Sequence, residues 1–201
     1  MGKKTEQSRI AYDKMASKYD SSLEGNYTRA HKAELIKNVA VKDGDTILDV
    51  ACGNGYLISE LSKKAKVNAF GVDLSENMIA VAKKRYPDIT FLAQPSVPLS
   101  FKNESIDVIT VSCAFHHFED PQGFADECMR TLKHDGVIYM AEPHFSPFIR
   151  WIANTVVFPF SHSGDVKVYS SKELSTFFKT AGFTRIQTYI KGSVLFFEAR
   201  K

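Results

Sequence analysis

The sequence is poor in cysteine and contains no long uninterrupted apolar run. Its three cysteines are an odd number, and no two of them form a C-x-x-C spacing. This excludes a cysteine-rich disulfide framework and gives no sign of a zinc site, so no metal is expected. The first ten residues, "MGKKTEQSRI", lack the apolar run of a secretory signal peptide. We therefore expect a cytoplasmic protein with reduced thiols.

The sequence also lacks a strong excess of charge of one sign. Its 26 basic and 23 acidic residues are spread along the chain and give a formal net charge of +3. Basic clusters such as 83–85 are short, which favours an ordinary solvated surface over nucleic-acid binding. The most apolar stretch, 145–160, is too short and too interrupted to predict a transmembrane segment. A length of 201 residues suits one domain, 1–201.

Short apolar runs alternate with segments of helical period, which is the pattern of an α/β fold. Because the runs are apolar almost throughout, they suit parallel strands covered by helices on both faces. We predict five such strands, at 46–51, 67–74, 89–93, 106–112 and 136–142. Two further strands, 183–190 and 193–200, are joined so closely at Lys191 and Gly192 that they must form an antiparallel hairpin.

The helices between these strands have recognisable ends. Ser75 and Asp120 are predicted N-caps, and Ser170 with Glu173 has the spacing of a capping box. Gly182 is expected to end the last helix. Two segments lie outside the alternation: an N-terminal helical cap at 1–44 and an insert at 143–169. Both flank the carboxyl ends of strands, where ligands bind in open α/β sheets, so both are candidate lids.

The stretch "ILDVACGNG" is a strand that breaks into a glycine turn at Gly53 and Gly55. Glycine permits a sharp turn and lets a ligand approach the backbone. A tight strand-to-helix turn without a ligand is the alternative. Asp73 ends the second strand, where a carboxylate can accept hydrogen bonds from two ribose hydroxyls. This arrangement predicts a ribose-binding unit, although it does not separate NAD from other nucleosides.

Three details disfavour a phosphate-bearing ligand. A dinucleotide fold usually has a third glycine in G-x-G-x-x-G, whereas this sequence has Ile58 there. Asp49 lies within the strand, where it would repel a pyrophosphate but attract an ammonium or sulfonium group. No G-x-x-x-x-G-K-[ST] motif is present to hold a triphosphate. A ligand with a ribose and a positive charge fits better.

Four stretches resemble, in order, the main sequence blocks of class I S-adenosylmethionine-dependent methyltransferases: "ILDVACGNG", "GVDLSENMI", "ESIDVITVSCAFHHFEDP" and "TLKHDGVIYMAEP". The resemblance is to the small-molecule group that contains the ubiquinone and menaquinone methyltransferases, and it covers most of the chain from Tyr12 onward. It implies a Rossmann-like, seven-stranded, mostly parallel sheet with helices on both faces and an antiparallel last strand. Its implied cofactor is S-adenosylmethionine.

The resemblance also implies positions for the cofactor. Asp49, Ala51, Gly53 and Gly55 would line its methionine end, Asp73 its ribose, and Leu74 and Met78 its adenine. The sequence departs from the family after the third strand, where Pro95 replaces an aspartate that commonly meets the adenine amino group. Backbone groups, Gln94 or Ser96 would then recognise the adenine.

The sulfonium already activates the methyl group, so the protein needs mainly to align the acceptor and exclude water. A general base is needed only if the acceptor must lose a proton. By position the candidates are His117, Glu142 and His144. The alternatives are a structural loop histidine at His117 and an acid bound to backbone donors at Glu142.

The leading hypothesis is therefore methyl transfer to a small apolar or aromatic acceptor, with the insert as the acceptor lid. An interfacial patch for a lipid-like acceptor such as a quinone is another interpretation of the insert. The runner-up functions are a non-catalytic S-adenosylmethionine-binding module and, less favoured, a nicotinamide-dependent oxidoreductase. A small-molecule acceptor is the expected partner, nucleic acid is not expected, and the oligomeric state cannot be inferred.

Overall fold

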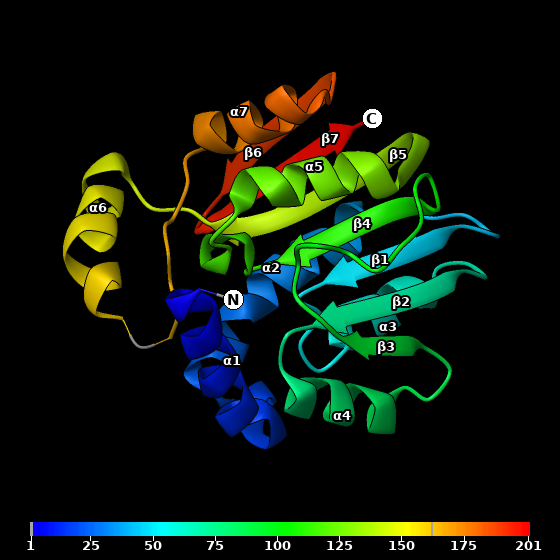
Figure 1. The fold of residues 1–201 in the computed structure, drawn as a ribbon, viewed down its shortest axis with the longest axis horizontal. Coiled ribbons are helices and arrows are strands. Elements are labelled where there is room, and N and C mark those ends of the chain that lie inside the picture. Colours follow the sequence, from blue (N-terminus) through cyan, green and yellow to red (C-terminus); the bar gives the residue numbers. More distant parts are fainter. Residues whose placement is uncertain (1, 162) are drawn as a thin grey trace.

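A computed structural model describes residues 2–161 and 163–201. These residues form one sheet of seven strands in the order β3-β2-β1-β4-β5-β7-β6 (Figure 1). β7 pairs antiparallel with both β5 and β6, while the other pairings are parallel. The predicted Rossmann-like fold is therefore confirmed. The strands are β1 Thr46–Val50, β2 Asn68–Asp73, β3 Thr90–Ala93, β4 Ile106–Ser112, β5 Leu132–Pro143, β6 Arg185–Lys191 and β7 Val194–Arg200.

Helices cover both faces of the sheet, as continuous apolar strands require. α2 (Leu23–Asn38), α3 (Tyr56–Ser62) and α4 (Glu76–Arg85) contribute to one core layer, and α5 (Pro121–Thr131) and α7 (Ser171–Ala181) to the other. Successive strand residues point to opposite faces. In β1, Ile47 belongs to the first layer and Leu48 to the second, and both are fully buried.

The predicted helix ends are confirmed. The side chains of Ser75, Asp120 and Ser170 each accept a backbone N–H of their helix, and Ser170 with Glu173 completes the capping box. Gly182 ends α7 with φ +108°. The hairpin turn lies one residue later than predicted, because Lys191 is still paired in β6. β5 begins earlier than predicted, since Leu132 pairs with β4 across a register shift.

Two segments lie beside the carboxyl ends of the parallel strands (Figure 1). The N-terminal cap consists of α1 (Lys3–Met15), the 3-10 helix η1 (Ala16–Ser21) and α2. The insert contains α6 (Pro147–Ile152), the π-helical turn η3 (Ala153–Val157) and the 3-10 turn η4 (Phe158–Phe160). In Figure 1, α6 projects away from the sheet.

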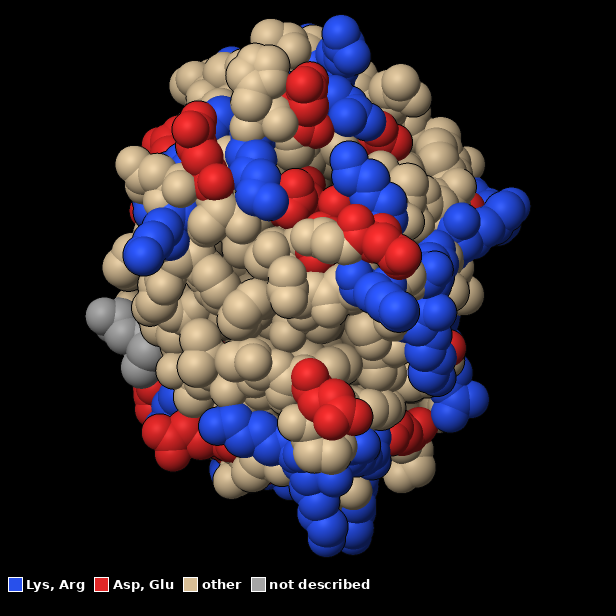
Figure 2. Space-filling model, turned by 90° about the vertical axis from the view of Figure 1, so that its right-hand side faces the viewer, with Lys and Arg blue, Asp and Glu red and all other residues tan. Residues whose placement is uncertain are grey.

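The face at the opposite edge of the sheet carries charged side chains mainly around its border (Figure 2). Figure 2 shows basic and acidic side chains bordering an uncharged centre on this face. Within the described part of the chain, no helix combines the length and the apolar character needed to cross a bilayer.

Candidate active site

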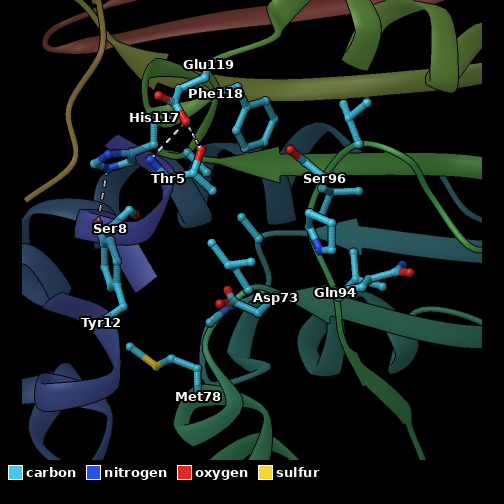
Figure 3. Close-up of a pocket in the computed structure, with 18 of the residues that line it drawn as sticks. Thr5, Ser8, Tyr12, Asp73, Met78, Gln94, Ser96, His117, Phe118 and Glu119 are labelled. Atoms are coloured by element: carbon cyan, nitrogen blue, oxygen red, sulfur yellow. Dashed lines mark hydrogen bonds between the residues drawn. The ribbon is translucent and has the colours of Figure 1, made fainter. Parts of the chain in front are cut away.

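A cavity of about 380 Å³ lies between α1 and the carboxyl ends of the strands (Figure 3). This volume is within the usual range of small-molecule sites, and the position is where open α/β sheets bind ligands. Its walls come from α1, η1 and the loops after the first four strands. The lining includes the predicted residues Ala51, Gly53, Asp73, Leu74, Met78, Gln94, Ser96 and His117.

The turn after β1 forms the floor of this cavity. Ala51 and Gly53 both have left-handed backbones, with φ +57° and +54°. A Cβ added to Gly53 would meet no atom within 4 Å, so the backbone there faces open space. Cys113, after β4, also has a positive φ of +52° and lines the cavity. Non-glycine residues in this conformation often gather at functional sites.

Asp73 is held by two backbone donors at the end of β2. Gly53 N donates to its Oδ2 and Ser75 N to its Oδ1, each at 2.8 Å. Burial raises the pKa of Asp73 above its ordinary value. Since each carboxylate oxygen has two lone pairs, one acceptor position per oxygen is left for a ligand. The carboxylate can therefore accept two hydrogen bonds from a ligand in the cavity.

Two buried polar groups on the cavity wall have no protein partner among the described residues. They are Gln94 Nε2 and Ser112 Oγ. A buried donor without a partner is costly, so both groups are suited to hydrogen-bonding a ligand. Gln94 lies beside Pro95, where the sequence predicted a substitute for the missing acid. Ser112 was not predicted, although a polar residue at the carboxyl end of a central strand is a signal for it.

Two predicted cofactor residues do not line the cavity. Asp49 is 2% exposed and accepts a 2.7 Å hydrogen bond from Thr110. Burial raises its pKa to about 7. Gly55 has φ +80°, and a Cβ there would meet Phe91 Cζ at 2.7 Å. The second glycine is therefore needed for backbone conformation and packing rather than for ligand approach.

His117 is the one candidate base of the three that lines the cavity. Its Nε2 is 3.3 Å from the hydroxyl of Tyr12, which comes from α1, and the two rings meet edge to face (Figure 3). Burial, together with the neighbouring His116, lowers the pKa of His117. The imidazole is therefore neutral near pH 7, with its Nε2 directed to the tyrosine.

Glu142 and His144 do not line the cavity. The Glu142 carboxylate accepts hydrogen bonds from Ala114 N at 2.9 Å, Phe115 N at 3.1 Å and His116 Nδ1 at 2.9 Å. These donors lower the pKa of Glu142 against the effect of burial. Glu142 thus organises the turn after β4, as its structural interpretation supposed. His144 continues from β5, and its N–H donates to Ser193 O at 2.7 Å. Neither residue is placed to act as the predicted base.

The segment that covers the cavity is α1, whereas the insert was the predicted acceptor lid. α1 supplies Thr5, Ser8 and Tyr12 to the lining, whereas no described residue of the insert 143–169 contributes. Glu119, after β4, accepts hydrogen bonds from Lys4 N at 3.2 Å and from Thr5 N at 3.1 Å. A carboxylate at a helix N-terminus is stabilising, so this contact holds α1 over the cavity. The pairing joins residues too distant in sequence to be recognised from it.

Comparisons with known proteins agree with this geometry. Residues 48–140 match the family described as "Methyltransferase domain". The chain is 31% identical over 154 residues to a demethylmenaquinone methyltransferase of Renibacterium salmoninarum, covering 74% of this chain and 65% of that protein. It is 28% identical over 193 residues to a 2-phytyl-1,4-naphtoquinone methyltransferase of Trichormus variabilis, covering 86% and 84%.

A solved structure has the same fold. It is a possible histamine N-methyltransferase from Thermotoga maritima, titled as dependent on S-adenosylmethionine, with a TM-score of 0.75 and 19% identity, covering 96% of this chain and 99% of that one. The chain spans less than two thirds of the demethylmenaquinone methyltransferases that it matches. None of these relatives is named as a nicotinamide-dependent enzyme. By its sequence blocks, its sheet and these relatives, the chain is similar to S-adenosylmethionine-dependent methyltransferases, and residues 48–140 match the methyltransferase domain.

Proposed function

We propose that the protein transfers a methyl group from S-adenosylmethionine to a small apolar or aromatic acceptor in the cavity below α1. The observation that carries the proposal is the doubly anchored Asp73 beside the open turn at Gly53. This pair presents a carboxylate and an accessible backbone to one ligand. The named quinone methyltransferases among the relatives support an acceptor of quinone type.

The cofactor is assigned to the lining residues by their chemistry. Asp73 accepts hydrogen bonds from the ribose hydroxyls, and Leu74 and Met78 pack on the adenine. Gln94 Nε2 donates to a ring nitrogen of the adenine, in place of the acid missing at Pro95. Ala51, Gly53 and Ser112 surround the methionine end.

The reaction depends more on aligning the acceptor and excluding water than on acid–base chemistry, because the sulfonium already activates the methyl group. His117 and Tyr12 form a polar pair on the wall of the cavity and meet the acceptor there. The hydrogen bond between them orients the imidazole. α1 closes the cavity, and its anchor at Glu119 keeps it there.

The insert is proposed as a second, outer lid that receives the acceptor. Six large apolar side chains of the insert are more than half exposed, including Phe148 at 69%, Trp151 at 60% and Phe160 at 76%. Their number suits contact with an apolar molecule. The end of the insert lies against α1, because Lys4 Nζ donates to Phe158 O at 2.7 Å and Ser161 O at 3.0 Å. Separately, the cytoplasmic location of the protein stays a prediction from its sequence.

Calorimetric titration tests the cofactor assignment. The wild type should bind S-adenosylmethionine and its demethylated product, and should not bind NAD. Asp73→Ala removes two charge-assisted hydrogen bonds of roughly 1.5 to 3 kcal/mol each, so the cofactor affinity should fall at least tenfold. The control is Asp88→Ala, at an exposed aspartate that does not line the cavity. Tighter binding of NAD, or unchanged affinity in folded Asp73→Ala, would contradict the assignment.

Incubation with methyl-labelled S-adenosylmethionine tests the reaction. Reduced quinones and a fractionated metabolite extract are offered as acceptors, and the labelled product is identified by mass. Cofactor binding with no labelled product from any acceptor would support the non-catalytic alternative.

A further inference from the structure

Three side chains with metal-ligand chemistry come together beside the cavity, and one of them, His117, also lines it. They are His116 and His117, in the 3-10 turn η2 (Phe115–His117), and Asp165, which follows the insert helices. One nitrogen of each histidine and a carboxylate oxygen all lie within 4.8 Å of one another. Asp165 Oδ1 is 3.9 Å from His116 Nε2 and 3.9 Å from His117 Nδ1.

The hydrogen bonds of His116 leave the facing nitrogen free to coordinate. Glu142 Oε2 is 2.9 Å from His116 Nδ1, and an ionised carboxylate can only accept, so the proton is on Nδ1. In the neutral imidazole the lone pair is then on Nε2, the atom that faces Asp165. Carboxylate, histidine and cation in this order are the usual arrangement around protein-bound metals.

His117 supplies an independent observation. Its side chain is 10% exposed, and Nδ1 has no hydrogen-bond partner among the described residues. The opposite nitrogen, Nε2, is paired with the Tyr12 hydroxyl at 3.3 Å. A buried ring nitrogen facing another imidazole and a carboxylate is unfavourable without a partner, and a cation that displaces any proton there would supply one.

Asp165 is held in place from both sides. Its Oδ2 accepts a hydrogen bond from Ser161 Oγ, which leaves Oδ1 toward the histidines. The next two residues are bound to the same turn, because Val166 N donates to His116 O at 2.9 Å and Lys167 N at 3.1 Å. The carboxylate therefore belongs to a built site rather than to a loose surface loop.

We propose that His116 Nε2, His117 Nδ1 and Asp165 Oδ1 bind one divalent first-row transition cation, of the Zn²⁺ or Fe²⁺ class. Two imidazoles and a carboxylate are a ligand set for these metals and leave positions open for water or another ligand. Tetrahedral coordination at about 2.0 to 2.2 Å places ligand atoms roughly 3.3 Å apart. The observed 3.9 Å separations need only small side-chain rotations to reach it.

The bound cation would join the end of the insert to the cavity wall. The site rests on geometry alone and does not depend on methyl transfer. It was not predicted, since the sequence has no closely spaced cysteine or histidine pattern that includes Asp165.

The test is metal titration of the full chain after treatment with a chelator. We expect one Zn²⁺ per chain by calorimetry, and visible d–d absorption when Co²⁺ is used. Asp165→Asn and His117→Gln should each weaken the affinity at least tenfold. The control His134→Gln, at a histidine whose side chain is 90% exposed, should stay within about twofold. Absence of saturable one-to-one binding, or equal binding by wild type and the two site variants, overturns the proposal.

A control that loses as much affinity as the site variants would place the cation on the surface and also overturn the proposal. X-ray absorption of the Zn²⁺-loaded wild type needs no variant, so it decides the question even if a variant fails to fold. Two imidazoles in the first shell support the site, and a shell without imidazole refutes it.

Discussion

The buried aspartate in β1 should make the stability of the protein depend on pH in an unusual direction. Among the described residues one side chain donates to Asp49, through Thr110 Oγ1, and burial raises the pKa of Asp49 to about 7. In the unfolded chain the pKa returns to its ordinary value of 3.8. Between these values the native state holds a proton that the unfolded state has lost, so this group lowers the stability as the pH rises.

The magnitude follows from the shift. A difference from 3.8 to about 7, at 1.36 kcal/mol per unit, corresponds to up to about 4 kcal/mol of lost stability above pH 7. Asp49→Asn keeps an oxygen that accepts from Thr110 and removes the titration. The variant should therefore match the wild type near pH 4 and exceed its stability by as much as about 4 kcal/mol at pH 8.

Urea unfolding of both proteins without cofactor, from pH 4 to pH 8, measures this difference. Taking the difference at each pH cancels the other titrating groups, which the two proteins share. A difference that does not change with pH, or that decreases toward pH 8, would refute the assignment of a protonated, buried Asp49. Wild-type refolding controls at each pH establish that the transitions are reversible.

Three further predictions concern packing, adenine recognition and the insert. Gly55→Ala should destabilise by about 2 to 4 kcal/mol and Gly44→Ala by about 1 kcal/mol in denaturant melts, because both have positive φ but only Gly55 also has a clash; equal effects would contradict this. Gln94→Leu should weaken cofactor binding about three- to tenfold in calorimetry, and unchanged affinity would place the adenine elsewhere. Phe148→Ala with Trp151→Ala should leave melting and cofactor affinity nearly unchanged, because both side chains are exposed, and should raise the acceptor KM. Unfolding or cofactor loss would assign the insert to the core.

Much of the fold could be predicted because its determinants are local. Continuous apolar runs indicate buried parallel strands, and the caps at Ser75, Asp120 and Ser170 act within a few residues of themselves. Asp73 could be predicted for the same reason. Its place at the end of a strand, one helix after the glycine turn, fixes which edge of the sheet it reaches.

The role of each polar residue at that edge was decided by tertiary contacts. Asp49 and Gly55 have the right spacing, but one points into the sheet's core and the other packs on Phe91. Glu142 has the right position for a base, yet the turn after β4 occupies its carboxylate. Sequence spacing gives a residue's place along the chain, whereas its partners depend on segments that meet only after folding.

The positions of the two lids and of the histidine pair also depend on contacts made only after folding. The sequence identifies the insert as apolar and predicts a helical cap in the N-terminal segment, where the structure has helices up to Asn38. That α1 covers the cavity depends on Glu119 meeting Lys4 and Thr5 across the molecule. That His116 and His117 face Asp165 depends on backbone hydrogen bonds from 166 and 167 to the turn after β4. Periodicity and helix capping involve residues close in sequence, so they can be predicted from it. The contacts of Glu119 with α1 and of the histidine turn with 166 and 167 join distant segments, and they form only once the sheet has brought those segments together.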